Sequence, residues 1–195
     1  MQTKLSKIAD ITSGYTFRGS LENLEGGDVF VLQAKNVVAN SDITNTTDLT
    51  STSSESIRKP FFLQYNDILI VSRGSGLGSF RSTVFASHQK NVIASSSVHI
   101  IRINDVTVLP KYISLWLNSS EGQKLLLQIV TGGSYIQSIL LKNLAELEIP
   151  IPPIHTQKSI VALEENIKQQ EKILNRKKEI KENIINATFN NLIKN

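Results

Sequence analysis

The sequence predicts an α+β protein in two parts, a mixed β-rich domain followed by one long helix. Short apolar runs rich in β-branched residues recur through the first hundred residues, with polar turns between them. A proline-rich segment then stands at residues 149–153, and about forty residues after it have the apolar repeat of one uninterrupted helix. We therefore expect a domain at residues 1–149, and a proline hinge with a long helix at residues 150–195.

Composition narrows the functional classes. The chain has 195 residues, of which 40% are hydrophobic, enough for a packed core. Its net charge of +4 is only a mild bias toward polyanions. The absence of cysteine excludes disulfides and thiolate metal sites. No apolar signal segment and no run of about 18 apolar residues occurs, so we expect a soluble, cytoplasmic protein without membrane contact.

The domain should contain several short strands and two short helices. The expected strands lie at residues 29–32, 61–63, 67–71, 83–86, 92–94 and 98–103, with a last β segment at 144–149. Such strands suggest a curved or barrel-like sheet, and residues 40–56 read as a polar surface loop. Pro110 starts an amphipathic helix that ends near Asn118. Ser120 and Gln123 resemble a capping box that opens a second helix, which ends at a Gly-Gly turn.

The long helix needs a partner. Its apolar positions are Ile160, Leu163, Ile167, Leu174, Ile184, Phe189 and Leu192. At 1.5 Å per residue it extends for nearly 60 Å, too far for a domain of about 150 residues to cover its apolar stripe. A second long helix has to come from another chain, which predicts a coiled coil. The basic middle, with Arg176, Lys177, Lys178 and Lys181, is either solvated or a surface for a partner.

Catalytic motifs are missing from the sequence. The glycines at 74, 76 and 78 have neither the spacing of a dinucleotide fingerprint nor the Gly-Lys-Ser/Thr of a nucleotide loop. The histidines at 88, 99 and 155 lack metal-ligand spacing, and His99 within an apolar strand is interpreted as a packed residue. Glu179-Ile180-Lys181 has the E-x-K of many nucleases, but no aspartate precedes it on a matching strand, so we interpret it as a solvated helix face. We find no motif of a serine hydrolase or an amino-methyltransferase. We predict a protein that is not an enzyme, with no catalytic residue, no metal and no cofactor of its own.

Binding residues are easier to suggest. Amide side chains can pair with adenine, lysine and arginine with guanine, and backbone amides of a glycine turn can approach a phosphate. The candidate DNA-binding residues are Gln33, Lys35, Asn36, Arg73, Gly74, Ser75, Gly76, Arg81, Lys90, Tyr135 and Gln137. The alternative for each is an ordinary solvated turn or strand end.

Several segments resemble, in the same order, those of one protein family. They are residues 66–70 with the basic glycine turn that follows, 109–113, 118–123 and the junction at 147–161. This order, from about residue 5 to residue 193, is similar to that in specificity subunits of type I restriction-modification systems. In that family a target recognition domain is joined to a spacer helix at such a junction. Thr156 stands where the family usually has an acidic residue, a small departure.

The resemblance implies a specific role. The usual family chain has two target recognition domains and two spacer helices, and this sequence has one of each. It implies a half-subunit that reads one half of a bipartite site in double-stranded DNA, as a homodimer through antiparallel spacer helices or with another specificity chain. Methyltransferase subunits would dock on the helices and bind S-adenosylmethionine, and restriction subunits would join indirectly. The alternatives are a truncated, non-functional specificity cassette, a coiled-coil adaptor that binds protein, and a small nuclease or transferase that acts alone.

Overall fold

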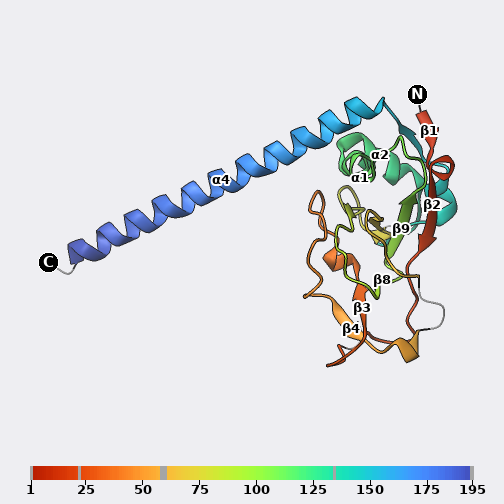
Figure 1. The fold of residues 1–195 in the computed structure, drawn as a ribbon, viewed down its shortest axis with the longest axis horizontal. Coiled ribbons are helices and arrows are strands. Elements are labelled where there is room, and N and C mark those ends of the chain that lie inside the picture. Colours follow the sequence, from red (N-terminus) through yellow and green to blue (C-terminus); the bar gives the residue numbers. More distant parts are fainter. Residues whose placement is uncertain (1, 22, 58–60, 134, 194–195) are drawn as a thin grey trace. The chain divides into compact units, whose positions relative to one another are not determined.

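The computed structural model describes residues 2–21, 23–57, 61–133 and 135–193, and in these the side chains of all but residues 56 and 190–193. It separates into two compact units, Met1–Gln157 and Lys158–Asn195, which we describe one at a time. Figure 1 shows a domain of small sheets and short helices, and the single long helix α4. The predicted α+β class is confirmed.

Two sheets form the centre of the domain. The larger has the order β2-β9-β5-β7, all antiparallel. Its strands are β2 (Ala9–Ser13), β9 (Val98–Ile103), β5 (Ile68–Val71) and β7 (Ser82–Val84). In the other, β3 pairs antiparallel with β4 and parallel with β8. Its strands are β3 (Val29–Leu32), β4 (Thr50–Thr52) and β8 (Val92–Ala94). Every residue of β5, β7 and β8 is buried. The side chains of β5 and β8 are apolar, whereas in β7 the Ser82 hydroxyl bonds to Ser114 and the Thr83 hydroxyl donates to the Ser41 carbonyl.

Two smaller sheets join parts of the chain that are distant in sequence. One has the order β10-β11-β6, and the other pairs β1 with β12. Their strands are β10 (Val130–Gly132), β11 (Gln137–Ile139), β6 (Arg73–Gly74), β1 (Gln2–Lys4) and β12 (Glu148–Pro150). Both ends of the domain therefore meet in one sheet.

Helices follow the β region in sequence. They are α1 (Pro110–Asn118), α2 (Ser120–Ile129), α3 (Leu141–Ala145) and α4 (Ile154–Ile193). In the described residues, single 3-10 turns occur at Leu5–Lys7, Ala34–Asn36 and Ser54–Ser56. Pro110 begins α1 as predicted. The cap of α2 is one residue earlier than predicted, because Ser119 accepts the hydrogen bond from the Gly122 amide.

A buried ion pair fixes the start of β5. Asp67 is 1% exposed, and its two carboxylate oxygens each lie 2.7 Å from a guanidinium nitrogen of Arg102 on β9. The backbone N–H of Gln64 donates to the same carboxylate at 2.7 Å. The hydrogen bond to Asp67 raises the pKa of Arg102. A buried carboxylate without these partners would cost free energy of folding, so Asp67 and Arg102 depend on each other at these two positions.

The strand predictions hold in part. Five of the six predicted central strands are present, although 61–63 contributes only an isolated bridge between Phe62 and Ile93. The strands do not close into one barrel, because they divide among small sheets. The predicted loop at 40–56 contains β4 and a 3-10 turn, and the predicted β segment at 144–149 is only β12. The sequence did not indicate β6, β10 and β11, which are short and largely polar.

One glutamine fixes the first turn of α4 to the domain. Gln157 is fully buried, and its Oε1 accepts from the Leu109 amide at 2.9 Å. Its Nε2 donates to the carbonyls of Thr107 at 3.0 Å and Pro152 at 2.8 Å. This is the glutamine of the proline-rich junction that we identified in the sequence. It holds two segments of the domain, residues 107–109 and the proline-rich junction, at the point where the helix begins.

Beyond Gln157, α4 is a solvent-exposed helix. Large apolar side chains stand exposed along it, and the predicted seam residues Ile160, Leu163, Ile167, Leu174, Ile184 and Phe189 are all among them. The side chain of Leu192, also predicted for the seam, lies outside the described residues. The structure adds Ile173, Ile180 and Ile185, which are exposed as well. None of the described helices is long and apolar enough to cross a membrane.

Candidate nucleic-acid interface

The glycine turn after β5 has a defined conformation. Gly76 and Gly78 have φ of 91° and 81°, values that residues with a Cβ rarely adopt. A Cβ on Gly74 would lie 2.2 Å from the Cβ of Ser79, so the two ends of the turn approach closely. The Ser75 amide also donates to the Ser79 hydroxyl at 3.1 Å. The predicted turn is therefore closed by its own residues.

A buried side chain of α2 makes a hydrogen bond to the backbone of this turn. Gln123 is 5% exposed, and its Oε1 accepts from the Gly78 amide at 3.1 Å. Its Nε2 donates to the carbonyls of Phe80 at 3.0 Å and Leu117 at 2.8 Å. The interpretation of Gln123 as part of a capping box is wrong, because its side chain bonds to the glycine turn instead. Nothing in the sequence around Gln123 indicated that its side chain would bond to the glycine turn.

The β10–β11 hairpin lies beside the glycine turn. Gln137 is opposite Gly74, and Ser138 is opposite Arg73 in this antiparallel register. Residues that precede Gln137 are therefore beside those that follow Gly74. Tyr135 is 90% exposed, and the sequence did not single out its neighbour Ile136, 67% exposed, or Leu77 in the turn, 68% exposed. Turn and hairpin together present an apolar tip next to the exposed Arg73.

A third segment, residues 33–36, is linked to the same place. Arg81, which ends the glycine turn, donates from Nε to the Val37 carbonyl at 3.0 Å and from Nη2 to the Ala34 carbonyl at 3.4 Å. Gln33 and Asn36 cap each other's backbone, and Gln33 also donates to the Thr50 hydroxyl at 3.2 Å. Lys35 is exposed, while Gln33 and Asn36 are half-buried. The two amides thus hold the shape of this loop.

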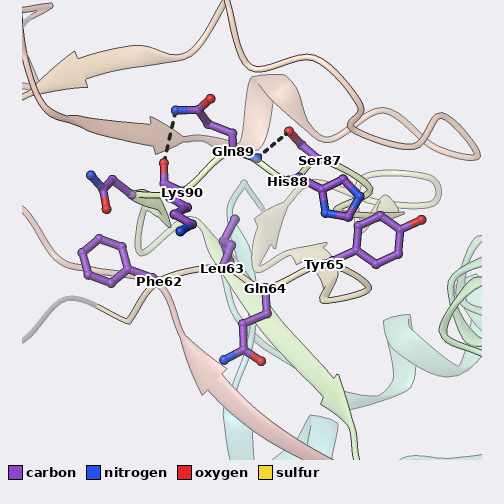
Figure 2. A pocket seen from close by; sticks show the side chains of 9 residues that line it. Phe62, Leu63, Gln64, Tyr65, Ser87, His88, Gln89 and Lys90 are labelled. Atoms are coloured by element: carbon purple, nitrogen blue, oxygen red, sulfur yellow. Dashed lines mark hydrogen bonds between the residues drawn. The ribbon is translucent and has the colours of Figure 1, made fainter.

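Lys90 is the one predicted DNA-binding residue that stands apart. It precedes β8, whereas residues 33–36 follow β3, and these two strands run parallel. Lys90 is therefore at the other end of this sheet from the loop. It lines a shallow hollow of about 400 Å³, where the rings of Tyr65 and His88 stack at 4.7 Å (Figure 2). The structure thus brings together all the predicted DNA-binding residues except Lys90.

A buried histidine lies behind β11. His99 donates from Nε2 to the Ile139 carbonyl at 2.7 Å, since a carbonyl can only accept. Burial lowers the pKa of His99, the bond to Ile139 opposes this, and the charge of Arg73 lowers it further. The interpretation of His99 as a packed residue is confirmed by its burial. Its bond to β11 was not foreseen.

Metal-ligating residues are not gathered anywhere in the part of the chain that the structure describes: no group of three or more His, Asp or Glu side chains is placed to hold an ion. The described interface offers amides, exposed cations and an aromatic ring. Such groups bind a polyanion and its bases. That the protein is not an enzyme stays a prediction.

Known structures share this fold. The chain is similar to the crystal structure of an HsdS subunit from Thermoanaerobacter tengcongensis, with a TM-score of 0.60 and 22% identity over 90% of this chain and 39% of that one. A structure that describes complex assembly and conformational transition of the type I R-M system gives a TM-score of 0.63 and 22% identity, over 90% of this chain and 40% of that one. A type I restriction-modification system S subunit from M. genitalium gives a TM-score of 0.54 and 18% identity, over 84% of this chain and 37% of that one.

The chain thus spans about 40% of the length of the first two solved chains. No curated protein sequence matches it. The family model for the type I restriction modification DNA specificity domain matches residues 1–183, which include the whole domain and most of α4. The chain belongs to the type I restriction modification DNA specificity domain family.

Proposed function

We propose that the chain reads one half of a bipartite DNA site for a type I restriction-modification system, without catalysing a reaction itself. The observation that carries this is the gathering of the glycine turn, the β10–β11 hairpin and residues 33–36 at one place in a domain of this family. Lys35 and Arg73 supply exposed charge for phosphates, and Tyr135 offers a ring for stacking. The polar side chains around them are candidates for base contacts.

The long helix supplies the second part of the proposal. Its exposed stripe pairs with that of a second copy in the antiparallel direction, so that two domains read two half-sites related by two-fold symmetry. The methyltransferase subunit docks on the paired helices and holds S-adenosylmethionine, and the restriction subunit joins through it. Membership of the family supports these partners, and the exposed apolar stripe supports the homodimer.

Binding of purified protein to DNA tests the recognition surface. The target sequence is first selected from random duplexes, with the methyltransferase subunit present. Arg73→Ala and Lys35→Ala should each weaken binding several-fold and reduce the salt slope by about 1, as for one lost phosphate contact. Lys90→Ala is the matched control, because Lys90 lies at the other end of the sheet, and it should change binding less. An equal loss in all three variants would contradict the proposed surface.

Mapping methylated sites in cells tests the symmetry. With this gene and its methyltransferase gene expressed together, the homodimer predicts a palindromic pair of half-sites with a fixed spacer. An asymmetric motif would mean that another specificity chain supplies the second domain. No methylation, together with no capture of the methyltransferase subunit in a pull-down, would indicate a non-functional cassette.

A protein-binding adaptor is the second candidate. The exposed Leu77, Tyr135 and Ile136 favour it, because contiguous exposed apolar side chains often mark protein contacts. Tyr135→Ala distinguishes the two. The substitution should weaken DNA binding if the ring stacks on a base, and should leave it unchanged if the tip binds only protein.

A further inference from the structure

We infer that Leu77, at the tip of the glycine turn, is an apolar wedge that inserts between two neighbouring base pairs of the half-site and unstacks them. The inference rests on the proposed function and deepens it, because it says that the domain distorts the DNA that it reads. It gives a role to an exposed apolar residue that the hydrogen-bonding candidates leave unexplained. Three observations carry it: the isolation of this side chain, the bracing of the turn and the charge around it.

The Leu77 side chain stands alone at the tip. It is 68% exposed, and the residues on either side of it are Gly76 and Gly78. Among the described residues, no atom other than those of chain neighbours lies within 4 Å of the place where a Cβ on either glycine would stand. Successive bases are only about 3.4 Å apart, so a slot opened between them is narrow. A single large side chain between two glycines can enter such a slot without a second side chain in the way.

The turn that carries the wedge is braced by hydrogen bonds on both sides of Leu77. The Gly78 amide donates to the buried Gln123 side chain at 3.1 Å. The Ser79 amide donates to the Gly76 carbonyl at 3.3 Å. A wedge has to keep its position against the stacking of the bases, and a turn fixed to a buried side chain can do so. A freely moving loop would be displaced instead.

The charge around the tip favours DNA over another protein as the occupant. Three segments meet there, residues 33–38, 72–81 and 130–140, and none contains an aspartate or a glutamate. Their charged residues are Lys35, Arg73 and Arg81. An apolar tip surrounded only by positive charge fits a polyanion whose stacked bases have apolar faces.

The β10–β11 hairpin supplies an aromatic ring beside the wedge. Gln137 pairs with Gly74, so Tyr135 lies beside the residues that follow Gly74 in the turn. Its ring is 90% exposed. A base that loses its stacked neighbour can stack on this ring instead, which offsets part of the cost of opening the step.

A wedge adds specificity without hydrogen bonds to bases. Pyrimidine–purine steps, which are TA, CA and TG, unstack more easily than other steps. The half-site should therefore contain such a step at the level of Leu77. Selected half-sites that lack every one of these steps would contradict the inference.

Mismatches placed one at a time along the selected half-site test the wedge. Affinity is measured by fluorescence anisotropy for the complex of this chain with its methyltransferase subunit. A mismatch at a pair that is only read should weaken binding by about tenfold or more. A mismatch at the wedge step should tighten binding by about 3- to 10-fold, because the stacking there is already lost. Leu77→Ala should remove this gain, and Leu77→Met, which keeps a long apolar side chain, should retain it.

Val106→Ala is the matched control for the loss of an exposed aliphatic side chain. Val106 is 96% exposed and follows the Ile103 end of β9, whereas Val71, just before the turn, pairs with Val98 at the other end. This variant should keep the gain at the wedge step. A gain at the base that the methyltransferase flips comes from that subunit and should persist in Leu77→Ala. Since Leu77 is exposed, Leu77→Ala should also unfold at the temperature of the wild type.

A fluorescent base gives a second measurement. 2-Aminopurine at the wedge step should brighten on binding of the wild type and stay dark with Leu77→Ala. Tight binding in which every mismatch outside the flipped base weakens affinity, and no other base brightens, refutes the wedge and leaves DNA recognition standing. A gain that persists at the same step in Leu77→Ala also refutes it. A complex that binds no duplex refutes both the wedge and the proposed function.

Discussion

The two units of this chain bury their apolar residues in opposite ways. In Met1–Gln157 many large apolar side chains pack in a core, with Phe80, Phe85 and Ile101 fully buried, although a few such as Leu77 and Ile136 are exposed. In Lys158–Asn195 every large apolar side chain of the stripe that the structure describes is at least 40% exposed. The first unit completes its core within the chain, and the apolar stripe of the second is exposed in the single chain. Substitutions should therefore affect folding in the first unit and association in the second.

The largest effect should come from the buried ion pair of the domain. Asp67→Asn removes the charge that Arg102 faces and should lower the free energy of unfolding by about 3–5 kcal/mol, the range for breaking a buried pair. Chemical denaturation followed by circular dichroism measures this. Asp48→Asn, an exposed carboxylate, is the control and should change stability by about 0.5 kcal/mol or less. If both variants lowered the free energy of unfolding equally, burial of the ion pair would not be the cause.

The second largest effect should be on formation of the proposed dimer. Leu174→Asp places a carboxylate at the centre of the stripe and should weaken dimer formation by about 100-fold, since an unpaired charge in a seam is strongly unfavourable. Unfolding of the domain should not change. Gln169→Asp introduces the same charge on the opposite side of the helix and should leave the dimer intact in sedimentation experiments. If the domain unfolds more easily in Leu174→Asp, the two units are not independent.

The first turn of α4, which belongs to the first unit, should give an intermediate effect. Gln157→Ala leaves the Leu109 amide and the Thr107 and Pro152 carbonyls without this partner and should cost about 1–3 kcal/mol. Faster hydrogen exchange at these amides would report the loss. The same substitution at the exposed Gln170 should be nearly neutral to domain stability. A neutral Gln157→Ala would show that the helix start is held by something else.

The smallest effect should be a pH dependence from His99. Burial lowers its pKa in the fold from the ordinary value of 6.5, so the unfolded chain binds the proton more readily. This contribution to stability is complete above that ordinary value and is lost as the pH falls below it toward the lowered pKa. His99→Gln, which keeps a donor for Ile139, should remove this part of the pH dependence. Thermal unfolding of both proteins from about pH 5 to about pH 7.5 measures the difference.

The sequence predicted what depends on local apolar runs. β3, β5, β8 and β9 were recognised because buried strands are rich in valine and isoleucine. The strands β6, β10 and β11 were missed, because their pairing depends on partners far along the chain. The same reason hid the side-chain roles of Gln123 and Gln157, whose hydrogen-bond partners are mostly in other segments.

The candidate site was predicted only in outline. Arg73, Tyr135 and Gln137 were named from composition and turn chemistry, but nothing in the sequence showed that their segments share one sheet. Lys90 seemed equivalent to Lys35, because both are cations in polar turns. Their separation became visible only from the parallel pairing of β3 and β8. Leu77 and Ile136 gave no signal, because an apolar residue in a turn is normally expected to be covered.

The pairing of β1 with β12 has a consequence for how such a protein can change. Thr3 lies opposite Ile149, so the chain enters and leaves the domain at neighbouring points. A different domain inserted between these two strands would meet the helix through the same short joint, provided that it also supplies an amide and a carbonyl for Gln157, as Leu109 and Thr107 do here. Under the proposed function, recombination at these two positions would exchange the DNA-reading domain and keep the helix that is proposed to pair. For the engineer, residues 5–147 are the part to replace, and the strands on either side are the part to keep.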